Sequence, residues 1–319
     1  MKNQSLEQLV SFPDGVTIIL DKVNKSGPLG TSAVVSLFVD CLLTLTEDSS
    51  AQSSRELFCE VVALLDYFYS TRGRFSVAVE NSFQPLSSKL HDFNQDREIE
   101  VLQELLADWV GGVQKDRQGR LSMLNCKGAR HLLGSNKIFL YDYSSTVMGV
   151  INELMKHTST LEVIVSESRT ADGGKPIVEE AIRIGCDISY IPDAAISQVM
   201  EGCDVVLVGV ETVFPSGTFT NTVGTLGVAI CAQYFGVPFM PVTETLKASS
   251  DMNENFDYSG VQKDLVDLLN NNLELNKERV VTNYPAIELI PGTLVNAYIT
   301  EYGNLKPDEF CDIAQLNES

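Results

Sequence analysis

The first candidate for chemistry in this sequence is Glu211, which comes shortly after the apolar run "DVVLVG". The stretch "NTVGT" (221–225) then places amide and hydroxyl groups just before a helical pattern. A partly desolvated glutamate can act as a general base, and the free amides at a helix start can hold an anion beside Asn221, Gly224 and Thr225. A structural carboxylate that accepts backbone N–H bonds is the alternative interpretation of Glu211.

A second candidate is the stretch "YDYSSTV" (141–147), in which Ser144 and Ser145 stand where a helix should begin. Serine hydroxyls at this position cap the helix, and the free amides of the first turn can cradle a phosphate. Simple capping and anion binding both fit these residues.

A third candidate is the glycine-containing stretch "SESRTADGGKP" (166–176), which holds Arg169 and Lys175. An arginine can hold a phosphate through two parallel hydrogen bonds, and a lysine adds a point charge. The alternative is a solvated loop with ordinary surface charges. Lys247 lies in a further stretch that follows an apolar run.

The elements that must position these residues differ between the two parts of the chain. Apolar residues recur at three- and four-residue spacing over 31–45, 55–70 and 97–114, which predicts helices, the last of them ending on a Gly pair. Trp109 lies on the apolar face of that last segment, which indicates packing rather than recognition. We therefore predict a helical N-terminal domain over 1–130.

From about residue 135, short runs rich in β-branched residues alternate with amphipathic helical segments. This alternation predicts right-handed βαβ crossovers and a parallel sheet that is covered on both faces. The expected fold class is α/β, with the helical domain followed by a Rossmann-like domain over 131–319. Ligands of such sheets bind at the carboxyl ends of the strands, where all the candidates above lie. The expected strands are 137–143, 161–168, 187–192, 204–209 and 237–244, and the expected helices between them begin near Ser144 and cover 175–185, 194–202 and 222–236.

Composition and motifs exclude several classes of function. The net charge of −20 opposes a general nucleic-acid or anionic-membrane surface. The sequence has no GxGxxG after its first strand and no GxxxxGK[ST], so we expect no dinucleotide cofactor. Seven cysteines without CxxC spacing, and three histidines with no nearby cysteine, favour reduced thiols and no metal site. No apolar signal core opens the chain, and we expect a cytoplasmic protein.

The stretch from "VIVSESRTADGGKP" to "FMPVTETLK", followed by the tail "YPAIELIPGTLVNAYITEYGNLKPDEF", resembles one superfamily over residues 135 to 310. That superfamily contains the alpha, beta and delta regulatory subunits of translation initiation factor 2B. It also contains isomerases that act on methylthioribose 1-phosphate and ribose 1,5-bisphosphate. The piece "STRGRF" (70–75) resembles an arginine loop of the isomerases, which implies that Arg72 binds phosphate.

The departures from the isomerase pattern decide what the resemblance implies. Asp142 stands where the isomerases have their catalytic cysteine, Glu211 where they have their aspartate, and Thr222 where they have a phosphate-loop lysine. The first two positions resemble the regulatory branch, and most of all its alpha subunits, whereas Thr222 departs from both branches.

The resemblance implies a regulatory protein that binds a phosphorylated sugar or nucleotide without isomerase chemistry. It would form a homodimer or higher oligomer through the Rossmann-like domain, with related exchange-factor subunits as further partners. Two alternatives stay open: an aldose–ketose isomerase that uses Asp142 and Glu211 as a carboxylate pair, and a scaffold whose pocket has decayed. The residues expected to line the ligand site are Arg72, Ser144, Arg169, Lys175, Asn221, Gly224, Thr225 and Lys247.

Overall fold

The computed structural model describes residues 12–25, 31–71, 76–251, 262–264 and 281–316. The chain divides into two compact units, Met1–Gln118 and Gly119–Ser319, and the division falls within one long helix. The domain limits of 1–130 and 131–319 remain a prediction from the sequence.

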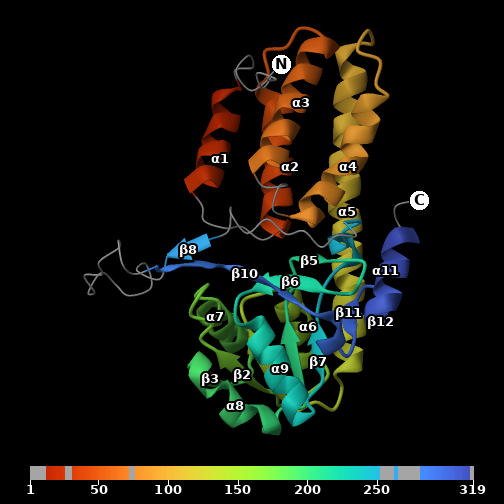
Figure 1. The fold of residues 1–319 in the computed structure, drawn as a ribbon. Helices are drawn as coiled ribbons and strands as arrows, with labels where there is room; N and C mark the ends of the chain where they lie inside the picture. Colours follow the sequence, from red (N-terminus) through yellow and green to blue (C-terminus); the bar gives the residue numbers. More distant parts are fainter. Residues whose placement is uncertain (1–11, 26–30, 72–75, 252–261, 265–280, 317–319) are drawn as a thin grey trace. The chain divides into compact units, whose positions relative to one another are not determined.

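The described part of the first unit is helical (Figure 1). Its core is rich in aromatic side chains, and the rings of Phe38 and Trp109 meet edge to face with their centroids 5.7 Å apart. Trp109 is only 3% exposed, which confirms its predicted packing role. The helices are α1 (Asp14–Lys25), α2 (Thr31–Asp48), α3 (Ser54–Thr71), α4 (Val77–His91) and the first part of α5 (Ile99–His131).

The prediction that a helix ends at the Gly pair near residue 112 is wrong, because α5 runs on to His131. A glycine inside a helix costs only about 1 kcal/mol relative to alanine. The continuation buries Leu124 and Ala129 in the core of the second unit. Burying such side chains contributes about 1.5–3 kcal/mol for a leucine, which offsets the glycine cost.

The second unit contains a parallel sheet of five strands with the order β3-β2-β1-β4-β7 (Figure 1). Both the α/β class and the Rossmann-like arrangement are therefore confirmed. The elements around the sheet are β1 (Lys137–Tyr141), α6 (Ser145–Met155), β2 (Glu162–Ser166), α7 (Gly174–Ile184), β3 (Asp187–Ile191), β4 (Val205–Val208), α9 (Thr225–Phe235) and β7 (Phe239–Pro241).

Alternation along the strands explains why both faces of this sheet are covered. Phe139 and Tyr141 of β1 point into one core cluster with residues of α9, whereas Ile138 and Leu140 point into another with residues of α6, α7 and α5. Successive side chains of a strand point to opposite faces of the sheet. A strand whose side chains are apolar on both faces must therefore be covered on both faces.

Two predicted helices differ from the structure. The segment 194–202 forms only short turns, namely η3 (Asp193–Ala195), α8 (Ile196–Val199) and η4 (Met200–Gly202). Helix α9 begins at Thr225 rather than at 222, because the residues before it form strand β6.

Strand β6 lies between β4 and β7 in the chain and belongs to a separate three-stranded antiparallel sheet with the order β10-β6-β5. It pairs with β5 and, on its other side, with a strand more than sixty residues later, an arrangement that local periodicity does not reveal. The remaining elements are β5 (Thr212–Val213), β6 (Phe219–Thr222), η5 (Thr245–Lys247), β8 (Gln262–Asp264), β9 (Asn283–Pro285), β10 (Ile287–Ile290), η7 (Gly292–Leu294), β11 (Tyr298–Thr300), β12 (Gly303–Leu305) and α11 (Pro307–Leu316).

Candidate functional site

The strand order places the candidate site at the carboxyl edge of the sheet between β1 and β4. Successive strands proceed from β1 toward β3 on one side and from β4 toward β7 on the other. Ligands of open α/β sheets bind at such a reversal of strand order. Tyr141 of β1 pairs in register with Val208 of β4, so Asp142 and Glu211 follow neighbouring strand ends.

Asp142 has its carboxylate held by hydroxyl groups from two other loops. The Thr222 hydroxyl donates a hydrogen bond to Oδ2 of Asp142, and the Ser168 hydroxyl lies 3.5 Å from Oδ1. Asp142 also has a left-handed backbone with φ of 59°, as do Ser168 at 45° and Asp172 at 54°. Non-glycine residues in this conformation are uncommon and cluster at functional sites. The loops after β1 and β2 and the end of β6 thus converge on Asp142.

Glu211 lies half-buried beyond β4, with its backbone N–H bonded to the Thr220 carbonyl at 2.9 Å. Among the residues that the structure describes, none donates a hydrogen bond to its carboxylate, so the structural role considered for Glu211 has no support there. Lys247 donates a hydrogen bond to the carbonyl of the preceding residue, Val210. Two predicted site residues, Glu211 and Lys247, therefore lie beside one another.

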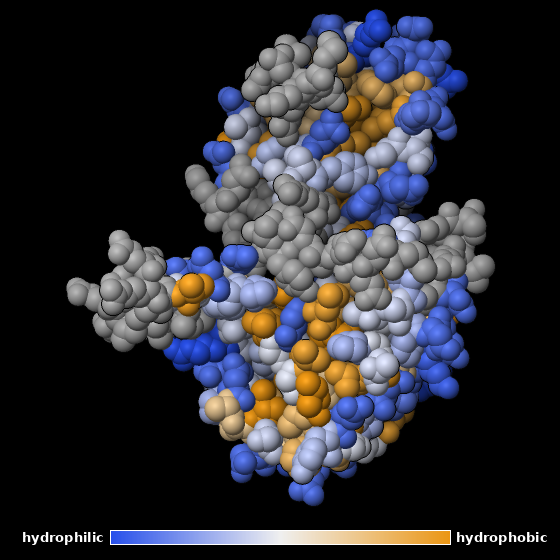
Figure 2. Space-filling view, in the orientation of Figure 1, coloured by the Kyte–Doolittle hydropathy of each residue, from blue (hydrophilic) through white to orange (hydrophobic). Residues whose placement is uncertain are grey.

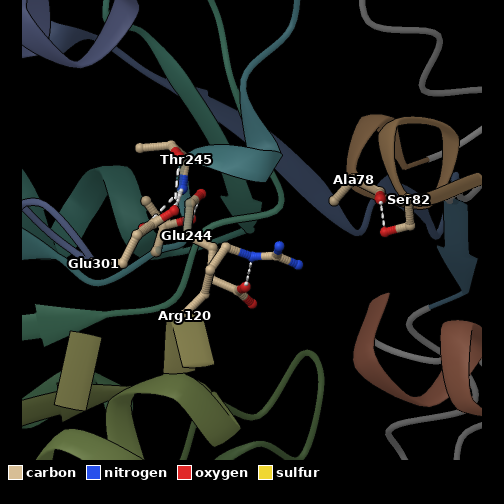
Figure 3. Close-up of polar contacts among 7 residues, drawn as sticks. Ala78, Ser82, Arg120, Glu244, Thr245 and Glu301 are labelled. Carbon is tan, nitrogen blue, oxygen red and sulfur yellow. Dashed lines mark hydrogen bonds and ion pairs between the residues drawn. The ribbon is translucent and has the colours of Figure 1, made fainter. Parts of the chain in front are cut away.

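The turn that carries Lys247 is fixed by a buried carboxylate (Figure 3). Glu301 is 2% exposed and accepts hydrogen bonds from the backbone N–H of Thr245 at 3.1 Å and from its hydroxyl at 2.7 Å. Burial raises the pKa of Glu301 above its usual value, although the hydrogen bonds from Thr245 oppose this. Beside it, Arg120 forms an ion pair with Glu244 at 3.1 Å. These contacts hold the Lys247 turn at the carboxyl edge.

The segment after β2 presents two cations, and the backbone amides of its loop are bound by Asp193 from the turn after β3. Asp193 accepts hydrogen bonds from the backbone N–H groups of Ser168 at 2.9 Å and Arg169 at 3.0 Å, and from the Ser166 hydroxyl at 2.5 Å. The Arg169 side chain is 58% exposed and lies 3.8 Å from Glu167, and Lys175 is exposed in the first turn of α7. The cationic side chains, rather than the loop amides, face solvent.

Ser144 is the N-cap of α6, and its hydroxyl accepts a hydrogen bond from the Val147 N–H at 3.4 Å. The predicted helix start is confirmed. Gly209 packs against this cap, since a Cβ at Gly209 would lie 2.8 Å from the Cβ of Ser144. The ends of β1 and β4 therefore approach one another closely at the site.

The start of helix α9 is capped by a carboxylate from a strand that is distant in the sequence. Gly224 is its N-cap and has no side chain to cap the first turn. Glu288 of β10 supplies the cap instead, accepting hydrogen bonds from the N–H groups of Gly224 at 2.7 Å and Leu226 at 2.8 Å. The buried residues Asn221 and Thr225 bond to each other at 3.1 Å. Of the "NTVGT" residues predicted to hold an anion, Asn221, Gly224 and Thr225 are thus committed to internal partners.

Tyr141 connects this helix start to the parallel sheet. Its hydroxyl donates a hydrogen bond to the Val223 carbonyl at 2.9 Å, and burial raises its pKa above the usual range. No pattern in the sequence pointed to Tyr141, Asp193 or Glu288, because each acts through a contact with a residue at least 25 positions away.

Arg72, predicted to bind phosphate, lies outside the described residues. Within the described ranges, no group of three or more His, Cys, Asp and Glu side chains is arranged to hold a metal ion. No helix in that part of the chain has the length and hydrophobicity needed to cross a bilayer.

Comparison with known proteins identifies the family. A family model described as "Initiation factor 2 subunit family" matches residues 30–307, which is most of the chain. The chain belongs to the initiation factor 2 subunit family.

Relatives within the family carry two kinds of name. A ribose 1,5-bisphosphate isomerase of Haloferax volcanii is 22% identical over 279 residues, covering 88% of this chain and 85% of the relative. A translation initiation factor eIF2B subunit alpha of Caenorhabditis elegans is 32% identical over 180 residues, covering 54% of each protein. The relatives therefore include both isomerases and regulatory subunits.

Solved structures share the fold over most of the chain. The translation initiation factor eIF-2B of Pyrococcus horikoshii superposes with a TM-score of 0.74 at 19% identity, covering 93% of this chain and 98% of that one. The 5-methylthioribose 1-phosphate isomerase of the same organism gives a TM-score of 0.77 at 18% identity, covering 95% and 87%. At this identity the likeness concerns the fold, which both kinds of protein have.

Proposed function

We propose that this protein is a regulatory member of the family, similar to the eIF2B alpha subunit, which binds a phosphorylated sugar or nucleotide without isomerising it. The ligand would lie at the carboxyl edge of the parallel sheet, between the ends of β1 and β4. Its binding would stabilise one assembly state of the protein through a difference in affinity between states.

The contact between Asp142 and Thr222 carries this proposal. These are two of the positions at which the sequence departs from the isomerase pattern, and their side chains are hydrogen-bonded to one another. In the isomerase pattern, cysteine and lysine at these two positions would supply a nucleophile and a cation. In this protein Asp142 and Thr222 supply a carboxylate that already accepts a hydrogen bond from a hydroxyl group. A strand-end site that lacks the nucleophile and the cation favours binding over turnover.

The remaining cations indicate where the phosphate would bind. Arg169 is exposed on the loop after β2, Lys175 is exposed in the first turn of α7, and Lys247 lies beside Glu211. A guanidinium and an ammonium in this segment provide directional and point-charge recognition of a phosphate. The sugar hydroxyls would then face Asp142 and Ser144, whose oxygens accept hydrogen bonds.

Binding can be measured by thermal shift and calorimetry with ribose 5-phosphate and nucleoside monophosphates. Arg169→Ala should weaken binding about tenfold or more, since a hydrogen bond to a charged group contributes about 1.5–3 kcal/mol. The matched control is Lys156→Ala, which removes a cation next to the C-terminal end of α6, beside Glu153. If no phosphorylated sugar or nucleotide binds, the scaffold alternative is favoured and this proposal is wrong.

The alternative function is a phosphosugar aldose–ketose isomerase that uses Asp142 and Glu211. It is supported by the length of the match to isomerase relatives and by the Glu211 carboxylate, which accepts no hydrogen bond from the described residues. Conversion of an aldose phosphate to a ketose phosphate that Glu211→Gln abolishes would favour this alternative.

We also propose that the protein acts in the cytoplasm as a homodimer or higher oligomer, with related exchange-factor subunits as further partners. Figure 2 shows apolar residues on the face of the second unit over which α9 runs. On that helix Ile230 is 52% exposed and Tyr234 is 82% exposed, which supports a partner on this surface. Light scattering should give an oligomer that Tyr234→Lys disrupts, and a monomeric wild type would contradict the proposal.

A further inference from the structure

The N-terminus of helix α9 already holds an anion, and that anion is part of the chain. Glu288 accepts hydrogen bonds from the N–H groups of Gly224 at 2.7 Å and of Leu226 at 2.8 Å, both through Oε1. Free amides and the helix dipole together make a helix start attractive to phosphate. Here two of these donors are occupied by a carboxylate.

The position of Glu288 is set by strand pairing. In the antiparallel pair of β10 and β6, Glu288 stands opposite Asn221, four residues before Thr225, where α9 begins. The main chain between them turns at Val223, whose N–H bonds to Ala286 at 2.9 Å and whose carbonyl accepts from Tyr141. Because the N–H and the carbonyl of Val223 are both hydrogen-bonded, the turn is fixed and the Glu288 carboxylate stays over the first turn of α9.

The second set of backbone donors at this edge is filled in the same way. The N–H groups of Ser168 and Arg169 donate to the two oxygens of Asp193 at 2.9 and 3.0 Å. An incoming phosphate at either position would meet a fixed negative charge as well as occupied donors. The like charges of the carboxylate and the phosphate repel each other at such a short distance.

We propose that Glu288 is a specificity-determining residue that restricts the site to ligands with a single phosphate. The phosphate binds the side chains of Arg169, on the loop after β2, and of Lys175, in the first turn of α7, and the other end of the ligand is an uncharged polyol or nucleoside. A sugar bisphosphate would place its second phosphate against Glu288 and is rejected. This choice of ligand class rests on the proposed function, whereas the closure of α9 to anions does not.

Calorimetry with ribose, ribose 5-phosphate and ribose 1,5-bisphosphate tests the ligand class. We expect wild type to bind the monophosphate about tenfold or more tightly than the bisphosphate, in keeping with the repulsion above. Glu288→Gln keeps an oxygen acceptor for the two amides and removes the charge. It should therefore reduce the ratio of the dissociation constants of the bisphosphate and the monophosphate at least severalfold. Glu201→Gln makes the same change in net charge at an exposed position in the η4 turn and should leave the ratio unchanged. Equal or tighter binding of the bisphosphate by wild type overturns the proposal.

A second measurement tests the closure of α9 without any sugar ligand. Inorganic phosphate is titrated into protein labelled with ¹⁵N at glycine and leucine, and the amide resonances of Gly224 and Leu226 are followed. They should stay unchanged in wild type and shift in Glu288→Gln. Saturable shifts in wild type, or no shift in the variant, overturn the role of Glu288, whatever the sugar phosphates do. If Glu288→Gln does not fold, Glu288→Asp, which keeps the charge, must retain the preference for the monophosphate.

Discussion

The two glycines that flank helix α9 allow a matched test of how the site is built. Gly224 at its N-terminal end has φ of 104°, and Gly236 at its C-terminal end has φ of 70°. An alanine at either position must adopt a left-handed backbone, which costs about 1–2 kcal/mol. A Cβ at Gly236 would meet no atom within 4 Å, so this backbone term is the whole expected cost of Gly236→Ala.

Gly224→Ala carries a further cost because Tyr141 lies against it. A Cβ there would be 2.0 Å from the Tyr141 hydroxyl oxygen and 2.8 Å from Cζ of the ring. Tyr141 is 2% exposed and cannot move aside without disturbing the core. Overpacking costs about 1–3 kcal/mol, and loss of the hydrogen bond to Val223 about 0.5–1.5 kcal/mol. We therefore expect Gly224→Ala to destabilise the second unit by about 2–4 kcal/mol more than Gly236→Ala does.

The assay must report the second unit separately. Hydrogen exchange of the β1 and β4 amides under mild denaturant measures the stability of the parallel sheet. Fluorescence of Trp109, the only tryptophan, reports the first unit in the same samples. Tyr141→Phe in the Gly224→Ala background removes the hydroxyl and should recover part of the loss. Equal destabilisation by the two alanine variants, or no recovery with phenylalanine, would refute the close approach of Tyr141 to α9.

Three further outcomes follow from burial and charge. Because burial raises the pKa of Glu301, the folded state holds its proton more tightly than the unfolded state does. Its stabilising contribution is therefore complete at low pH and is lost as pH rises through the folded-state pKa. The unfolding free energy of wild type relative to Glu301→Gln, from urea titrations, should fall as pH rises above the usual glutamate pKa of about 4.3. Arg120→Ala leaves the Glu244 carboxylate, which is 10% exposed, without its partner and should lower the unfolding free energy by about 1–3 kcal/mol. Lys137→Ala breaks the pair with Glu162, whose side chains are 36% and 32% exposed, and should lower the unfolding free energy by less than about 1 kcal/mol. Equal losses would contradict the difference in burial. In native protein a thiol reagent should modify the exposed Cys59 rapidly and spare the buried Cys41, whose pKa burial raises to about 12. Mass spectrometry measures the modification of each cysteine over time. Rapid modification of Cys41 would show that the core of the first unit opens.

The parallel sheet and its covering helices could be predicted because their signals are local. Apolar runs such as "KIFLY" and the glycine that ends α7 belong to single elements, and alternation of strand and helix then dictates the topology. The helix start at Ser144 was predictable for the same reason. The long continuation of α5 was not, because its last turns are stabilised by packing on the second unit's core rather than by helix propensity.

The candidate site was only partly predictable because its key contacts join distant segments. The sequence indicated Asp142 and Thr222 as separate departures from a family pattern, and their hydrogen bond spans 80 positions. The amides before α9 resembled an anion site, but a carboxylate from β10, 64 positions from Gly224, caps them. Periodicity and motif spacing carry no information on such pairings, which depend on the register of β6 with β10.

The central claim, binding without isomerisation, is tested most directly by ³¹P NMR spectroscopy. The protein is mixed with ribose 5-phosphate, ribose 1,5-bisphosphate and 5-methylthioribose 1-phosphate in turn, and the ligand resonance and any ketose product are followed together. We expect a monophosphate resonance to broaden with wild type but much less with Arg169→Ala, and no ketose resonance to appear. A ketose resonance that grows with time and is abolished by Glu211→Gln would contradict the claim.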